Sequence, residues 1–236
     1  MDFDWSVISQ YRSELLSGFW LTIVYTIASS VLGMTWGTLL ALARLSSRAW
    51  LRMPATVVLE VVRGVPLLVL LIWFYYAFPL LTQLSLSPMA AAIISLSLYG
   101  GSYYGEIVRG GILSVEAGQT DAALSLGMTY AERMRRVVLP QAFRRMVPPL
   151  VNQTIIQLKN TSLASIVTVA ELVYQAQAVS ARTYRPLEVY TAVALLYLVL
   201  VLPASAVSRR LELKNSRYGS SGARRRRTKV KVGVVA

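Results

Sequence analysis

The chain alternates between long apolar stretches and short charged segments. Five stretches are long and apolar enough for helices that cross a hydrocarbon core of about 30 Å, at 1.5 Å per residue. We predict these spans at residues 19–43, 57–79, 89–112, 148–173 and 188–207. The pattern therefore predicts an all-α membrane protein with five transmembrane helices, preceded by an N-terminal tail over residues 1–18.

Two of the five stretches depart from a plain apolar pattern. Pro66 lies inside the second and predicts either a kink or a break there. The fourth opens at Pro148-Pro149, and polar groups replace apolar ones along it: Gln153, Gln157, Lys159 and Asn160. The three amides share one helical face. That face is predicted to line a substrate pathway, to form hydrogen bonds between subunits, or both.

The segment from residue 116 to 140 is polar, although it lies between apolar spans. Glu116 and Asp121 come early in a predicted helix, where acids suit the positive end of the helix dipole. The small pair Ala122-Ala123 would let another surface approach closely, and Gly127 is predicted to end or bend the helix. Residues 116–140 thus predict a helical elbow that docks into a groove on a partner protein.

Charge along the chain predicts the orientation. The sequence has 24 Lys and Arg against 11 acids, and ten of the basic residues follow Ser208. The first loop and the elbow are also basic, whereas the N-terminal tail has only Arg12 as a basic residue. Because basic loops stay in the cytoplasm, we predict the N-terminus outside and the elbow and C-terminus cytoplasmic. Residues 209–236 lack periodicity and predict a disordered tail attracted to anionic lipid.

The composition argues against an enzyme and against a metal site. The chain has no histidine and no cysteine, which removes the commonest general base and the strongest metal ligands. The 11 acids are scattered along the chain. An integral membrane enzyme would need clustered acids or a nucleophile with a base, so we expect no catalytic residue and no bound metal or cofactor.

The elbow resembles the EAA signature of permease subunits of ATP-binding-cassette (ABC) importers. The matching residues are Asp121-Ala122-Ala123, Gly127 and Leu139-Pro140. Further stretches are similar to the polar amino acid branch: Arg63–Leu67, Tyr104–Ile112, Gly118-Gln119, Leu139–Ala142, Lys159–Leu163 and Val169–Leu172. Asp2–Trp5, Leu45–Ser47 and Leu71–Tyr75 look most like permeases for glutamate and aspartate. The resemblance covers residues 1–212.

This resemblance implies a type I ABC importer permease fold in the bacterial inner membrane, with no active site of its own. It implies a second permease subunit, two cytoplasmic ATPase subunits that bind ATP, and a periplasmic binding protein that delivers a polar amino acid, glutamate or aspartate. The residues implied to couple to the ATPase are Glu116, Gly118, Asp121, Ala122, Ala123, Gly127, Leu139 and Pro140. The alternative is an ATP-independent secondary transporter or channel, a class that often carries inverted repeats not evident here.

Two positions depart from the family pattern, and they bear on the substrate pathway. Asp121 replaces the usual Glu, and Asn160 stands where many relatives have Asp. Lys159 is thereby left without an adjacent acid inside a span, which is costly unless the cation faces a cavity or a partner. We expect Lys159 either to face the pathway and favour an anionic substrate, or to pair with an acid such as Glu171 or one on the partner subunit.

Two charged positions complete the predicted pathway set, each with a structural alternative. Arg63 could bind a substrate carboxylate or anchor its span at the cytoplasmic interface. Glu106 could contact substrate or form a structural ion pair with Arg109, three residues further along the helix. The full predicted pathway set is Gln153, Gln157, Lys159, Asn160, Arg63 and Glu106.

Overall fold

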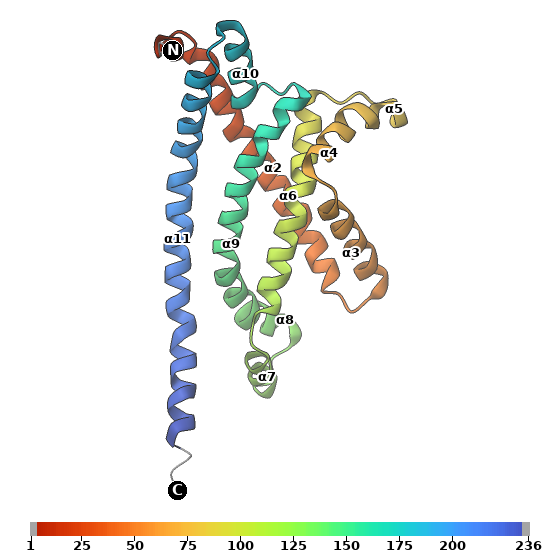
Figure 1. Cartoon of the computed structure of the whole chain (residues 1–236). Coiled ribbons are helices and arrows are strands. Elements are labelled where there is room, and N and C mark those ends of the chain that lie inside the picture. The colour runs from red at the N-terminus through yellow and green to blue at the C-terminus, as the bar shows by residue number, and fades with distance from the viewer. Residues whose placement is uncertain (1–3, 233–236) are drawn as a thin grey trace.

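The computed structural model describes residues 4–232, with side chains described through Lys214, and every regular element in that range is helical (Figure 1). The α-helices are α1 (Ser6–Gln10), α2 (Arg12–Arg44), α3 (Ala49–Gly64), α4 (Leu67–Ile72), α5 (Phe78–Thr82), α6 (Pro88–Leu113), α7 (Ala117–Ser125), α8 (Tyr130–Arg133), α9 (Leu139–Asn160), α10 (Leu172–Thr183) and α11 (Pro186–Val232). Two π-helical turns, Trp73–Ala77 and Met134–Val138, and a 3-10 segment, Thr161–Val167, join some of them. The all-α prediction is confirmed.

The core of the molecule is the contact between α2 and α6. Glycines on both helices let the two backbones touch: a Cβ atom added at Gly105 would lie 2.7 Å from the carbonyl oxygen of Gly37. One added at Gly33 would lie 2.9 Å from the carbonyl oxygen of Ser97, and Trp36 Nε1 donates a 2.7 Å hydrogen bond to that same oxygen. Small residues at a helix contact are typical of membrane proteins, where close packing replaces the hydrophobic effect.

Helix α2 has its large apolar side chains outside and its small ones inside. Residues such as Thr22, Ser29 and Gly37 are buried, and the hydroxyls of Thr22 and Ser29 donate to backbone carbonyls four residues earlier. Trp20 and Leu39 are more than 60% exposed. A water-soluble domain would show the reverse distribution. This distribution is suited to a bilayer, where the outer face meets lipid tails or another membrane helix.

The second predicted span is broken rather than kinked. Helix α3 ends at Gly64, α4 begins at Leu67, and the two are inclined by 100°. Pro66 explains the break, because proline has no N–H to continue the helix and forces the residue before it into an extended conformation. Val65 is indeed extended, with φ −93° and ψ 131°.

The fourth predicted span begins earlier than expected. The prediction placed its start at Pro148-Pro149, but both prolines lie inside α9, which begins at Leu139. Pro140 lies in the first turn of α9, where a missing N–H costs nothing. At its other end α9 passes into the 3-10 segment, which stops at Thr168 in a left-handed conformation with φ 60°.

Helix α11 continues to Val232, into the segment that the sequence predicted as a disordered tail. No proline follows Pro203, and Lys and Arg are good helix formers, but the helix also runs through Gly219-Ser220-Ser221-Gly222, whose low helix propensity favoured the sequence prediction. Near its start, Glu188 binds Arg185 at 3.1 Å and accepts a hydrogen bond from the backbone N–H of Asp4. These contacts join α11 to the N-terminal segment, at the end of the molecule opposite the elbow (Figure 1).

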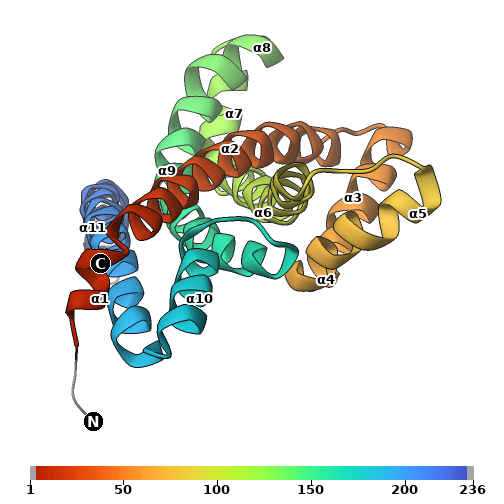
Figure 2. The same cartoon turned by 90° about the horizontal axis from the view of Figure 1, so that it is seen from above.

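Within the described residues, two helices are long and apolar enough to cross a membrane alone: α2, and α11 over Pro186–Lys214. Two bent pairs qualify as broken spans, α3 with residues 67–82, and residues 130–167 with α10. Helix α6, at Pro88–Leu113, lies where the third span was predicted. Figure 2 shows α1 and α11 at one edge of the molecule and α3 to α5 at the other, with α2 running between them. Five separate spans and their orientation stay predictions.

The close contact between α2 and α6 at Gly37 can be tested by substituting the glycine. In Gly37→Ala the new methyl group would overlap the backbone of Gly101, so α2 and α6 must separate. We expect a loss of about 1–3 kcal/mol in unfolding free energy, as for other overpacked sites, measured as a lower thermal unfolding midpoint of the detergent-purified protein. Gly110→Ala is the matched control: it lies on α6 with nothing within 4 Å of an added Cβ and should be neutral or slightly stabilising. Equal effects would contradict the packing argument.

Candidate coupling surface and polar centre

The elbow is a short helix closed by a glycine. Helix α7 ends at Ser125, and Gly127 follows with φ +71°, a conformation that other residues rarely adopt. The N–H of Gly127 donates to the Leu124 carbonyl at 2.9 Å, and the N–H of Met128 donates to the Ala123 carbonyl at 3.1 Å. Glycine at this position lets the chain reverse and satisfies carbonyls at the helix end. Gly127 therefore ends the helix, as the sequence predicted.

A capping box starts the next helix. The Thr129 hydroxyl accepts from the N–H of Glu132, and the Glu132 carboxylate accepts from the N–H and hydroxyl of Thr129. The hydrogen bonds from Thr129 lower the pKa of Glu132. The capping interaction is therefore fully present at neutral pH and is lost only when the pH falls through that lowered pKa. Arg145 on α9 donates to the carbonyl of Ser114 at the end of α6, and Gln141 Nε2 on α9 donates to Gln119 Oε1 on α7 at 3.4 Å, which joins the elbow to α9.

Most of the predicted coupling residues are exposed on this elbow. Glu116, Gly118, Asp121, Ala122, Gly127, Leu139 and Pro140 face solvent, whereas Ala123 is buried against the chain itself. A Cβ added at Gly118 would meet nothing within 4 Å. The structure adds three large exposed side chains that the sequence prediction left out: Leu124 (52% exposed), Leu126 (77%) and Tyr130 (70%). Helix α7 protrudes from the helix bundle (Figure 1), and it carries exposed apolar side chains with the acidic residues Glu116 and Asp121 beside them.

Charged residues from three helices form one network beside the bundle. Arg44 on α2 binds Glu106 on α6 at 2.7 Å and approaches Glu60 on α3 at 3.7 Å. Glu106 also binds Arg109 at 2.5 Å, and Glu60 binds Arg63 at 2.6 Å. Glu106 and Arg109 therefore form the ion pair predicted from their spacing, and Arg63 and Glu106 hold helices together within the subunit.

The predicted amide stripe of α9 divides between the interior and the surface. Gln157 is fully buried, and its Nε2 donates to the Leu96 carbonyl on α6 at 2.8 Å and to Ser29 Oγ on α2 at 3.0 Å. Gln153, one turn away, is also buried, while Asn160 is half-buried. Gln157 thus supplies hydrogen bonds between helices of one subunit, an arrangement the sequence interpretation had assigned to contacts between subunits.

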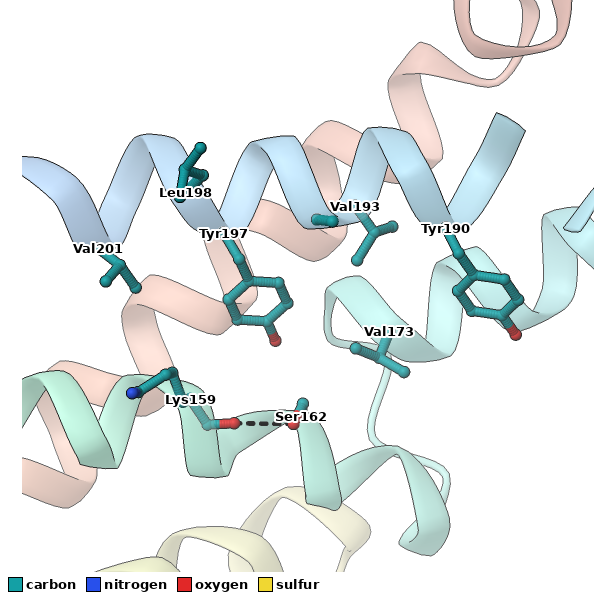
Figure 3. Close-up of a pocket in the computed structure, with 9 residues that line it drawn as sticks. Lys159, Ser162, Val173, Tyr190, Val193, Tyr197, Leu198 and Val201 are labelled. Atoms are coloured by element: carbon teal, nitrogen blue, oxygen red, sulfur yellow. Dashed lines mark hydrogen bonds between the residues drawn. The ribbon is translucent and has the colours of Figure 1, made fainter. Parts of the chain in front are cut away.

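Lys159 lies in a groove between α9, α10 and α11 (Figure 3). The groove has a volume of about 440 Å³ and carries Ser162, Tyr190 and Tyr197 among valine, alanine and leucine side chains. The expected alternative partner, Glu171, does not bind Lys159. Its two oxygens accept from the N–H groups of Val173 and Tyr174, and Oε2 also accepts from the Tyr197 hydroxyl.

The carboxylates within the predicted spans are thus all engaged elsewhere. Glu60 and Glu106 bind arginines, Glu188 binds Arg185, and Glu171 is held by α10 and Tyr197. Within the described residues, Lys159 is therefore the one cation of the predicted spans that has no carboxylate within ion-pair distance.

A helical membrane subunit with an exposed elbow, and with one lysine in a largely apolar groove, has the architecture expected of a transport permease. Comparison with known families places the chain within that class: residues 29–217 match the model of the family described as binding-protein-dependent transport system inner membrane components. The chain belongs to this family. The resemblance to ABC importer permeases and the inner-membrane location, both inferred from the sequence, are confirmed.

Curated relatives share the full length of the fold. The chain is 39% identical over 213 residues to the glutamine transport system permease protein GlnP of Escherichia coli K12, covering 90% of this chain and 97% of that protein. It is 38% identical over 211 residues to the glutamate/aspartate import permease protein GltK of E. coli O6:H1, covering 86% and 94%. It is 40% identical over 216 residues to the L-cystine transport system permease protein TcyB of Bacillus subtilis, covering 91% and 92%.

Solved structures agree with the fold. An amino acid ABC transporter crystallised with histidines matches with a TM-score of 0.86 and 33% identity, covering 91% of this chain and 100% of that chain. The MetNI methionine ABC transporter matches with a TM-score of 0.68, at 20% identity, covering 84% and 94%.

The charged network predicts unequal effects of removing its two carboxylates. Glu106→Gln takes the shared acceptor from Arg44 and Arg109, which are only 15% and 30% exposed, and should lower the unfolding free energy by about 1–3 kcal/mol. Glu60 is 49% exposed, so Glu60→Gln should cost about 0–1 kcal/mol. Thermal unfolding of both purified variants compares them, and a larger loss in Glu60→Gln would show that the network is not centred on Glu106.

Proposed function

We propose that this protein is the membrane-spanning permease subunit of an ATP-driven importer for polar amino acids, with glutamate or aspartate as substrate. The observation that carries the proposal is the elbow. It is joined to α9 by the hydrogen bond from Gln141 to Gln119 and capped at both its turns, yet Leu124 and Leu126 are exposed and the helix surface at Gly118 is bare. An exposed glycine weakens a helix by about 1 kcal/mol relative to alanine. Because glycine has no side chain, however, another protein can approach the helix closely at this position.

The proposed partners follow from the family. Two cytoplasmic ATPase subunits receive the elbows of two permease subunits, identical or paralogous, and a periplasmic binding protein delivers the amino acid. ATP is bound by the ATPase subunits, so this chain needs no cofactor and performs no catalysis. Motion of the closing ATPases enters at the elbow and reorients the spans. An ATP-independent transporter would have no use for such an elbow, which makes that alternative the weaker one.

The choice of substrate rests on Lys159 and on the likeness to glutamate and aspartate permeases. The relatives named above transport glutamine, glutamate and aspartate, or cystine. Lys159, at the groove end of α9, has no carboxylate of its own and needs an anion or water as its partner. We propose that a substrate carboxylate is that anion.

Gly118→Trp tests the coupling surface. The indole would project from α7 without touching the rest of the chain, so the fold stays intact while the docked partner is displaced. In membranes that contain both subunits, the ATPase recovered with tagged permease should fall about tenfold or more, since each 1.4 kcal/mol of lost contact is about tenfold in affinity. Gly64→Trp, equally open but on α3, is the control and should retain the ATPase. Full recovery with Gly118→Trp would contradict docking at the elbow.

Uptake competition tests the substrate. Cells that carry the complete importer should take up labelled glutamate, with aspartate competing more strongly than glutamine. Lys159→Gln should reduce glutamate uptake at low concentration about tenfold, the cost of a charge-assisted hydrogen bond. Arg182→Gln removes an exposed cation outside the groove and should leave uptake unchanged. Unchanged uptake in Lys159→Gln would exclude Lys159 from substrate binding.

A further inference from the structure

The π-helical turn Met134–Val138 joins the elbow to α9. The N–H of Leu139 donates to the carbonyl of Met134, five residues earlier, whereas an α-helix uses the carbonyl four residues earlier. The turn therefore holds one residue more than an α-helical turn. Helix α8 leads into it and α9 leaves it, so one helical course runs from Tyr130 to Val167. The extra residue thus lies where the proposed coupling surface meets the long helix.

Pro140 accounts for the wide turn. If the segment continued from α8 as a regular α-helix, the ring of Pro140 would clash with the carbonyl of Arg136, and that carbonyl would have no backbone donor. The wide turn avoids the clash, because it ends at Leu139 and places Pro140 in the first turn of α9. The first-turn position of Pro140 is therefore a consequence of the π-turn.

The other π-turn of the described residues has the same arrangement. It covers Trp73–Ala77, the N–H of Phe78 donates to the carbonyl of Trp73, and Pro79 follows. Proline alone is not sufficient, however, because Pro148-Pro149 lies in α9, which is α-helical throughout. A second interaction must favour the wide turn before α9.

Gln141 supplies this second interaction. Its Nε2 donates to the carbonyl of Val137, inside the π-turn, at 3.0 Å and to Oε1 of Gln119 on α7 at 3.4 Å. A side-chain amide has two N–H groups, so it can make both bonds at once. One amide therefore connects the wide turn with the exposed helix of the elbow.

The extra residue sets a direction. Successive residues of an α-helix are rotated by about 100°, so a regular helix built from the same residues would turn the elbow about the α9 axis by roughly that angle. The exposed Leu124 and Leu126 would then point elsewhere. On the basis of the proposed function, we propose that Pro140 is a positioning residue for coupling: together with Gln141 it maintains the π-turn that directs α7 toward the ATPase.

A distance measurement tests the direction of the elbow without any partner. The chain has no cysteine, so Leu126→Cys and Phe143→Cys, at 77% and 62% exposed positions on the elbow and on α9, give two unique sites for nitroxide labels. Pulsed electron paramagnetic resonance of the purified permease measures their separation. Pro140→Ala lets the segment form a regular α-helix and should shift the distance by about 5 Å or more, the radius of a helix with its side chains.

Deletion of Arg135 provides the rescue. Arg135 is an exposed residue of the π-turn, and its deletion removes the extra residue. In the Pro140→Ala background the deletion should restore the wild-type distance, whereas with Pro140 present it should not, because the ring still clashes with a regular helix. Gln141→Leu, which keeps the proline, should broaden the distance distribution. Pro54→Ala, in a helix without a π-turn, is the control and should leave the distance unchanged.

Recovery of the ATPase with tagged, unlabelled permease tests the consequence. Pro140→Ala should lower recovery about tenfold or more, and the additional deletion of Arg135 should restore it. A second change that restores recovery could not do so if Pro140→Ala had simply unfolded the protein. Pro54→Ala should retain the ATPase.

The outcomes separate this inference from the proposed function. An unchanged distance in Pro140→Ala, or a shifted distance that the deletion does not restore, shows that Pro140 does not set the direction of the elbow. Wild-type recovery despite a shifted distance shows that the direction does not matter for docking. Each of these results overturns the inference, while docking at the elbow is judged separately by Gly118→Trp.

Discussion

The close approach of α2 and α6 is the constraint on which the rest of the structure depends. Where two backbones touch at Gly37 and Gly105, no side chain can fill the interface, so helix direction and register are fixed together. The register then decides which polar groups can meet. Gln157 on α9 reaches Ser29 on α2 and the Leu96 carbonyl on α6 because those two helices are already in contact. Inside a membrane, such buried hydrogen bonds from a side-chain amide favour one helix register over shifted registers, because a shifted helix would leave the polar groups without partners.

Away from this centre, charges hold α3, whereas α10 and α11 also pack with α1 and α2 through an apolar cluster that includes Leu15, Leu172 and Val193. Helix α3 buries only Ala55 and Leu59, and the network around Glu60 and Glu106 supplies its polar contact with α2 and α6. Helix α11 is joined to the N-terminal segment through Glu188 and to α10 through Glu171 and Tyr197. Each of these attachments can be released without opening the glycine contact. A subunit that must change its outline during transport needs this division between a rigid pair of helices and more loosely held neighbours.

The sequence was enough to predict what depends on local chemistry. Helices α2 and α6, the end of α7 at Gly127 and the Glu106–Arg109 pair follow from apolar length, glycine and helical spacing. What depends on tertiary context was missed. Pro148 and Pro149 were interpreted as a helix start, but the helix runs through them. Pro66 left a kink and a break both open, and the chain is broken there with a turn of 100°. The Gln157 contacts could not be assigned to one subunit, because an amide pattern shows a polar face but not which helix covers it.

The unbroken course of α9 connects the two parts of the proposed site. The helix runs 22 residues from Leu139, next to the elbow, to Asn160, beside the groove. At 1.5 Å per residue it spans about 33 Å, the thickness of a hydrocarbon core. The elbow continues directly into α9, and Gln141 on α9 also binds Gln119 on α7, so a displacement of the elbow is transmitted along a single helix to Lys159. Helix α11, which carries Tyr197, is not part of this connection between the elbow and the groove through α9. In the proposed mechanism, motion of α9 against α11 changes the shape of the groove that both helices line, so the force that enters at the elbow would directly alter how well the groove fits an amino acid.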